Sequence, residues 1–77
     1  MAKVRALIPG TQSIRKAPSE VDCFYQVISD VDGNVVLHLT TFGFDQRKST
    51  KKSSQSLQID KKIAKDLVAL LDHVFQV

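Results

Sequence analysis

The chain has 77 residues, of which 43% are hydrophobic and 25% charged, and its formal net charge is +3. A chain of this length is expected to form one small domain, which buries only about 60% of its unfolded surface. No apolar run approaches the roughly 18 residues that a membrane-spanning helix needs. The one cysteine, Cys23, allows neither an internal disulfide nor a cysteine-based zinc site. These features exclude a membrane protein, a disulfide scaffold and a large enzyme, and they favour a reducing, cytoplasmic setting.

Charge is divided into blocks along the chain. Residues 1–21 carry four basic side chains against one acidic, residues 22–46 carry four acidic and no basic ones, and residues 47–54 carry four basic ones. Clustered basic residues attract polyanions such as nucleic acids. Basic loops also keep small proteins soluble, so charge alone leaves both interpretations open.

The chain divides into an arm and a folded domain. Residues 1–21 contain Pro9, Gly10 and Pro18, which predict a basic N-terminal arm with a short edge strand within Lys3–Ile8. Residues 22–77 are expected to contain a β-sheet and a C-terminal helix.

A β-hairpin is the strongest local pattern. Asp22–Ser29 and Val35–Phe44 are rich in β-branched and aromatic residues and predict two strands. Asp32-Gly33 lies between them and favours a two-residue type I′ turn, in which both central residues have positive φ.

This turn predicts that Ile28 lies opposite Leu37, Gln26 opposite Leu39 and Phe24 opposite Thr41. The pairing in turn predicts which side chains share each face of the sheet. The face expected to pack on the helix contains Phe24, Gln26, Ile28, Leu37 and Leu39. The other face would contain Tyr25, Val27, Val36, His38, Thr40 and Phe42. A register shift of one residue would exchange the faces of one strand.

The remaining segments predict a basic loop, a strand and a helix. Residues 45–54 lack periodicity, whereas Gln55–Ile59 alternates as a third strand of the sheet does.

Asp60 is expected to cap a helix over Lys61–Phe75. One apolar stripe of this helix contains Ile63, Leu67, Leu70 and Val74, and an adjoining stripe contains Ala64, Val68, Leu71 and Phe75. The second stripe predicts either a homodimer interface or burial under the N-terminal arm.

The sequence contains no pattern typical of an enzyme. His38 and His73 lie on different elements, and Cys23 is more typical of a half-buried thiol at a strand start than of a nucleophile. Residues 30–34 lack the closing glutamate of a calcium loop and are expected to form a turn. We therefore expect no catalytic residue, metal or cofactor.

An aromatic strand beside a basic loop points instead to single-stranded nucleic acid, whose bases stack on rings and whose phosphates meet cations. Tyr25 and Phe42 are the candidate stacking residues, with His38 and Thr40 as hydrogen-bonding neighbours. The candidate phosphate ligands are Arg47, Lys48, Lys51 and Lys52 in the loop, with Arg15 and Lys16 in the arm. The same rings could instead pack under the N-terminal segment.

Two stretches, FYQVISDVDGNVVLHLTTF and SLQIDKKIAKDLVALL, resemble the positive cofactor four family. Its members are transcriptional coactivators and bacterial relatives that bind single-stranded DNA. The resemblance implies an α+β fold in which a curved antiparallel sheet, a β-meander, packs on one C-terminal helix. It also implies a homodimer formed through the helices and a non-enzymatic role in transcription regulation or DNA maintenance, with DNA preferred over RNA.

The chain differs from that family at the hairpin turn. Residues 29–34 are acidic and carry no ring, whereas the family has basic residues and an aromatic there. Thr40 and Gly43 stand where the family has a basic residue and a large aromatic. The alternative interpretation is a small protein-interaction or regulatory module, which dimerises through its helix and binds no nucleic acid.

Overall fold

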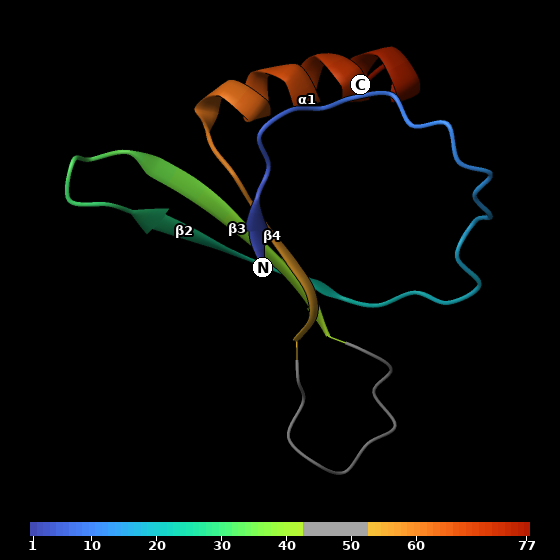
Figure 1. Ribbon diagram of the computed structural model, residues 1–77, viewed down its shortest axis with the longest axis horizontal. Helices are drawn as coiled ribbons and strands as arrows, with labels where there is room; N and C mark the ends of the chain where they lie inside the picture. The colour runs from blue at the N-terminus through green and yellow to red at the C-terminus, as the bar shows by residue number, and fades with distance from the viewer. Residues whose placement is uncertain (43–52) are drawn as a thin grey trace, which may run out of the picture.

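The computed structural model describes residues 1–42 and 53–77, which form an α+β fold of one sheet and one C-terminal helix (Figure 1). The strands are β1 (Ala2–Lys3), β2 (Cys23–Ser29), β3 (Val35–Phe42) and β4 (Ser53–Ile59), and the helix is α1 (Lys61–Phe75). The predicted fold class, the hairpin strands and the bounds of the helix are confirmed. The last two residues predicted for the second strand, Gly43 and Phe44, and most of the predicted basic loop lie outside the described residues.

The sheet has the strand order β1-β4-β3-β2. The pairs β2–β3 and β3–β4 are antiparallel, as predicted for residues 22–77, and the parallel pairing of β1 with β4 makes the sheet mixed. The short edge strand predicted over Lys3–Ile8 covers only Ala2–Lys3. Lys3 pairs with Gln58, and the Val4 N–H donates to the Gln58 carbonyl at 2.8 Å. Because β4 ends at Ile59, the chain beyond Val4 has no strand left to pair with.

The hairpin loop is longer than the predicted type I′ turn. The Gly33 N–H donates to the Asp30 carbonyl at 3.1 Å, and the Asp30 N–H donates to the Asn34 carbonyl at 3.0 Å. Within the loop only Gly33 has positive φ, at 84°, whereas a type I′ turn needs two such residues. The loop therefore matches the three-residue hairpin connection in which a turn is followed by a left-handed glycine.

The carboxylate of Asp30 holds this loop in place. Its Oδ1 atom accepts hydrogen bonds from the backbone N–H of Asp32 at 2.8 Å and of Asn34 at 3.0 Å. These bonds lower the pKa of Asp30, the largest effect coming from the Asn34 backbone. Asp30 thus has a structural role as the first residue of the turn.

The longer loop shifts the predicted register by one residue. Phe24 lies opposite Thr40, Gln26 opposite His38 and Ile28 opposite Val36. The predicted partners were Thr41 for Phe24, Leu39 for Gln26 and Leu37 for Ile28, and this prediction is wrong. Since neighbouring side chains point to opposite faces, the shift exchanges the faces of every β2 residue.

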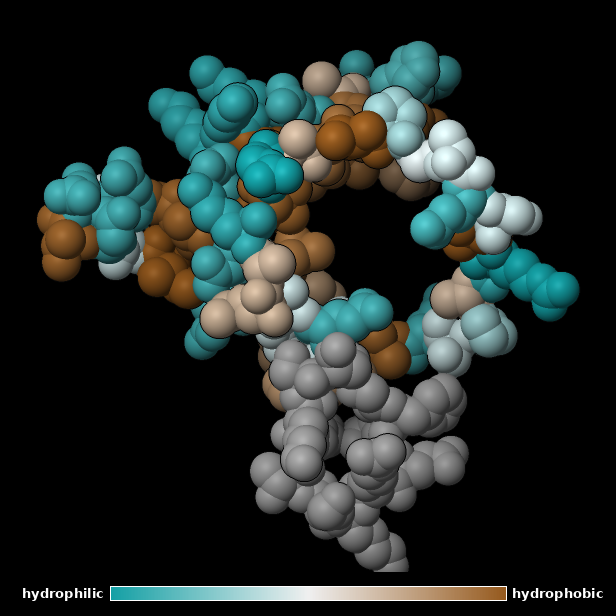
Figure 2. Space-filling model, in the orientation of Figure 1, coloured by the Kyte–Doolittle hydropathy of each residue, from teal (hydrophilic) through white to brown (hydrophobic). Residues whose placement is uncertain are grey.

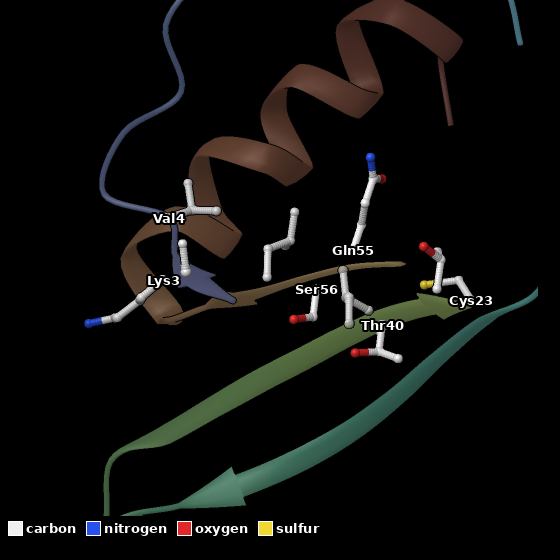
Figure 3. Close-up of a pocket in the computed structure, with 10 residues that line it drawn as sticks. Lys3, Val4, Cys23, Thr40, Gln55 and Ser56 are labelled. Carbon is white, nitrogen blue, oxygen red and sulfur yellow. The ribbon is translucent and has the colours of Figure 1, made fainter. Parts of the chain in front are cut away.

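The two faces of the sheet follow from this register. The inner face, on the side of α1, contains Tyr25, Val27, Val35, Leu37, Leu39, Leu57 and Ile59. The outer face contains Phe24, Gln26, Ile28, Val36, His38, Thr40, Phe42, Ser56 and Gln58. Figure 3 shows the alternation, because Cys23 and Gln55 point to the side of α1 while Thr40 and Ser56 point away from it. The prediction was right for β3 and wrong for β2.

Helix α1 begins where β4 ends, at a capped and charged junction. The Ile63 N–H donates to the Asp60 Oδ1 atom at 3.0 Å, which confirms Asp60 as the N-cap. The Lys3 Nζ atom lies 3.0 Å from the Asp60 Oδ2 atom, so the same carboxylate ties β1 to the helix. At the other end Gln76 adopts a left-handed conformation, and its N–H donates to the Asp72 carbonyl at 2.7 Å.

The buried core is confined to this junction. Among the described residues only Ile59 and Ile63 are buried, with 7% and 2% of their surfaces exposed. Leu67 is half-buried, and the apolar side chains of the later helical turns are exposed. Figure 1 shows why: α1 diverges from the sheet after its first turn. The helix therefore covers only a small part of the inner face.

We expect replacement of the cap to lower stability in a pH-dependent way. Hydrogen bonding from the Ile63 N–H, and then the contact with Lys3, lower the pKa of Asp60 below 3.8. A group whose pKa falls on folding stabilises the protein above its unfolded pKa and loses that effect as pH falls. Asp60→Ala should therefore lower the melting temperature at pH 7, and the difference from the wild type should shrink below about pH 3.8.

Thermal unfolding followed by circular dichroism from pH 2 to pH 8 measures this difference. Asp60→Asn keeps an acceptor but loses the charge, so it should fall between the other two proteins. Asp66→Asn, an exposed carboxylate in the middle of α1, is the matched control and should change little. A difference that does not vary with pH would contradict the role given to the carboxylate.

Candidate nucleic-acid interface

Two aromatic rings lie together on the outer face, where β2 begins and β3 ends. Phe24 and Phe42 are in edge-to-face contact, with their ring centroids 5.4 Å apart and an interplanar angle of 81°. Phe24 keeps 55% of its surface exposed, because β2 is the edge strand of the sheet. The sheet thus presents an accessible ring supported by a second one.

Polar side chains continue the outer face beside these rings. The His38 Nε2 atom lies 3.0 Å from the Thr40 Oγ1 atom, and its Nδ1 atom lies 3.1 Å from the Gln58 Nε2 atom. An amide N–H can only donate, so Nδ1 accepts, and the hydrogen of the neutral ring lies on Nε2 and is donated to Thr40. The Gln58 amide also donates to the Met1 Sδ atom at 3.4 Å. The network holds a hydroxyl and an amide oxygen at fixed places within reach of a ligand.

The outer face has few charges of its own. Lys3 of β1 pairs with Gln58 and adds one basic side chain to this face, but it is in an ion pair with Asp60. Most cations for phosphates would therefore have to come from adjoining segments. The predicted phosphate ligands Arg47, Lys48, Lys51 and Lys52 lie outside the described residues. They belong to the residues that follow Phe42 in the sequence.

Among the residues that the structure describes, three of the predicted site residues lie together, whereas Tyr25, Arg15 and Lys16 lie apart from them. His38, Thr40 and Phe42 share the outer face as predicted, but Tyr25 lies on the inner face. Phe24 takes the place of Tyr25 beside Phe42. Asp30 and Gly33 stand at the first and fourth positions of the turn, where aspartate and glycine are typical of type I. The sequence therefore did contain a signal for this register.

The predicted arm residues are not next to the outer face. Arg15 and Lys16 are exposed, and the middle of the arm lies across an opening from the sheet (Figure 1). Cys23, at the start of β2, is an exposed free thiol instead of the half-buried one that we expected. It is exposed because no described element covers the adjoining edge of the sheet.

The arm also leaves the second helical stripe uncovered. Ala64, Val68, Leu71 and Phe75 are all exposed, and Val68 and Phe75 each keep 65% of their surface exposed. Of the two predictions for this stripe, burial under the N-terminal arm is therefore wrong. The homodimer interface stays a prediction.

Two open apolar cavities lie on the inner face. One, of about 480 Å³, separates α1 from the sheet and is bordered by Leu37, Ile59, Leu67 and Leu71 among others. The other, of about 510 Å³, is bordered by residues of β1, β3 and β4 and by the start of β2, with Val4, Cys23 and Gln55 pointing toward it (Figure 3). Most of the surface of both cavities is apolar, which suits a protein surface better than a charged ligand.

A metal-holding group and a membrane-spanning helix are both absent from the part of the chain that the structure describes. No group of three or more His, Cys, Asp or Glu side chains is placed to hold a metal ion in residues 1–42 and 53–77. Within those same ranges no helix has the length and apolar character needed to cross a membrane.

Comparisons with known proteins give no match: no protein-family model fits the chain, and no curated protein or solved structure is similar to it.

Proposed function

We propose that this protein binds single-stranded nucleic acid, DNA in preference to RNA, on the outer face of its sheet and catalyses no reaction. The observation that carries the proposal is the pair of exposed Phe24 and half-buried Phe42 beside the hydrogen-bonded polar side chains His38, Thr40 and Gln58. Rings offer stacking surfaces to any unpaired base, and the polar groups offer hydrogen bonds to base edges.

A single strand suits this face better than a duplex does. Bases in a duplex are stacked on each other and cannot reach a ring, whereas the bases of a single strand can be splayed onto one. Among the described elements none projects from the outer face to enter a major groove, because α1 lies on the other side of the sheet.

The phosphates would be neutralised by Arg47, Lys48, Lys51 and Lys52, which follow Phe42 closely in the sequence. The resemblance to the positive cofactor four family supports the preference for DNA and a role in transcription regulation or DNA maintenance. The free thiol of Cys23 is consistent with a reducing, cytoplasmic setting.

We also propose that the protein is a homodimer that pairs through the second stripe of α1. Apolar side chains at Val68, Leu71 and Phe75 are exposed in one row, and a second copy would remove them from water. A patch of this kind is self-complementary when two helices related by a two-fold axis pack together.

The competing proposal is an interaction module that binds no nucleic acid. It is favoured by the apolar inner face, on which Tyr25 and Val27 are largely exposed. The two proposals differ in their prediction for a random single-stranded oligonucleotide, since only the first expects binding at micromolar protein and low salt.

Replacing the exposed ring should weaken oligonucleotide binding. Phe24→Leu removes the stacking surface but keeps an apolar side chain at the strand. Because stacking of one base is worth about 1 kcal/mol or more, we expect the Kd to rise about fivefold to tenfold. Fluorescence anisotropy with a labelled single-stranded oligonucleotide measures the change.

Tyr25→Leu is the matched control, because the neighbouring residue of the same strand lies on the inner face. Its Kd should stay close to that of the wild type. Equal losses for Phe24→Leu and Tyr25→Leu would mean that the outer face is not the binding surface.

Removal of the basic loop residues should change the salt dependence of the same titration. Each phosphate contact on a single strand contributes about 0.7 to the slope of log K against log salt concentration. The quadruple variant Arg47→Ala, Lys48→Ala, Lys51→Ala and Lys52→Ala should therefore flatten the slope by up to about 3. The matched control replaces Lys61 and Lys62, two exposed lysines of the first turn of α1, by alanine. An unchanged slope in the quadruple variant would contradict the assignment of phosphate contacts to these four residues.

Charges placed in the second stripe should separate the dimer. We expect Val68→Glu with Phe75→Glu to give the mass of one chain, because a stable interface cannot bury two unpaired carboxylates. Light scattering after size-exclusion chromatography measures the mass. Lys65→Glu, on the polar side of the same helix, should stay dimeric. A wild-type protein that has the mass of one chain at every concentration would contradict the dimer.

A further inference from the structure

We propose that the N-terminal arm, residues 5–22, lies across helix α1 of a second copy, with Ile8 and Ile14 as its apolar anchors. The inference rests on the proposed homodimer and adds that each copy contributes its arm to the interface. It assigns a partner to a segment that makes little contact with its own chain.

The arm is tied at both ends and makes little contact between them. Its start is fixed by the hydrogen bond from the Val4 N–H to the Gln58 carbonyl, and its end by the pairing of Cys23 with Thr41. Within the described parts of the chain, residues 5–22 make no backbone hydrogen bond to a strand or to the helix. Ile8 and Ile14 each keep 80% of their surface exposed.

An extended segment of this kind needs a surface to lie on. Fixing each backbone residue costs conformational entropy, and that cost must be offset by contacts. The described atoms of the chain itself supply few of them, because every residue from 5 to 22 is exposed.

The arm borders an opening that is large enough to be seen through. Figure 2 shows this opening in the space-filling view, enclosed by α1, the arm and the sheet, with apolar atoms of the helix and the sheet at its edge. Both apolar cavities lie on the inner face of the sheet, which is the face turned toward α1. The start of the arm is held by the short pairing of β1 with β4 and by the ion pair between Lys3 and Asp60.

The area needed for a stable dimer points to the arm as part of the interface. One large apolar side chain contributes on the order of 100 Å² when it is buried. The three large side chains of the second stripe, Val68, Leu71 and Phe75, therefore offer roughly 300 Å². A specific interface buries about 800 Å² on each partner. Further exposed apolar side chains are Leu70 and Val74 on α1, Tyr25 and Val27 on the inner face, and Ile8 and Ile14 on the arm. Exchange of arms brings these surfaces into one symmetric interface.

Photocrosslinking of mixed copies tests the exchange. A photoreactive phenylalanine analogue replaces Ile14 in the full chain, and copies made with ¹⁴N and ¹⁵N are mixed, irradiated and digested. We expect crosslinked peptides of mixed isotope composition that join the arm to residues 61–75. The matched control carries the analogue at Val31, a fully exposed apolar residue at the hairpin loop, and should give no such peptide.

A second measurement follows the strength of the dimer without a probe. Ile8→Asp with Ile14→Asp should raise the dimer dissociation constant at least about tenfold in sedimentation experiments, and Val31→Asp should leave it unchanged. Unchanged dissociation in the arm variant, or crosslinks confined to copies of one isotope in a protein with the mass of a dimer, would overturn the exchange and leave the helix-paired dimer standing. A single-chain mass for the wild type would overturn both.

Discussion

The loop between β2 and β3 fixes the pairing register on which the whole candidate site depends. The Asp30 carboxylate accepts two backbone N–H groups, and Gly33 supplies the one left-handed residue, so the loop closes on the pair Asp30 and Asn34. Every pairing between the two strands follows from that closure. With one residue fewer in the loop, Phe24 would face α1 and the outer face would lose its most exposed ring.

A second constraint is the small core. The junction of β4 and α1 buries Ile59 and Ile63, and the Asp60 carboxylate joins the helix to Lys3 of β1. This junction sets the direction of α1, but it leaves most of the helix and the inner face uncovered. Small domains without disulfides often gain stability by association, and in our proposal a second copy covers the exposed apolar rows.

The two faces of the sheet therefore have different tasks in our proposals. The inner face and α1 are apolar and suit a protein surface, whereas the outer face combines rings with a hydrogen-bonded polar network. Because the outer face carries little charge, affinity for a nucleic acid would come from the adjoining basic segments and placement of the bases from Phe24, Phe42 and the His38 network. Association of copies through one side of the sheet would leave the other side open to a ligand.

The sequence by itself determined the elements. Asp60 and the apolar periodicity defined α1 because capping and burial of a helical face are local properties, and the alternation in Val35–Phe42 placed Leu37 and Leu39 correctly on the inner face. It also identified His38, Thr40 and Phe42 as neighbours, since residues two apart on one strand share a face.

The tertiary structure decided how the elements pair, although Asp30 and Gly33 gave a local signal for the hairpin register. The apolar pattern of β2 does not distinguish that register from one shifted by a residue, because both of its faces carry apolar side chains. The short parallel pairing of β1 was likewise decided by the end of β4, which lies far away along the chain. The exposure of the second helical stripe depended on the angle at which α1 leaves the sheet, and packing at a single junction sets that angle.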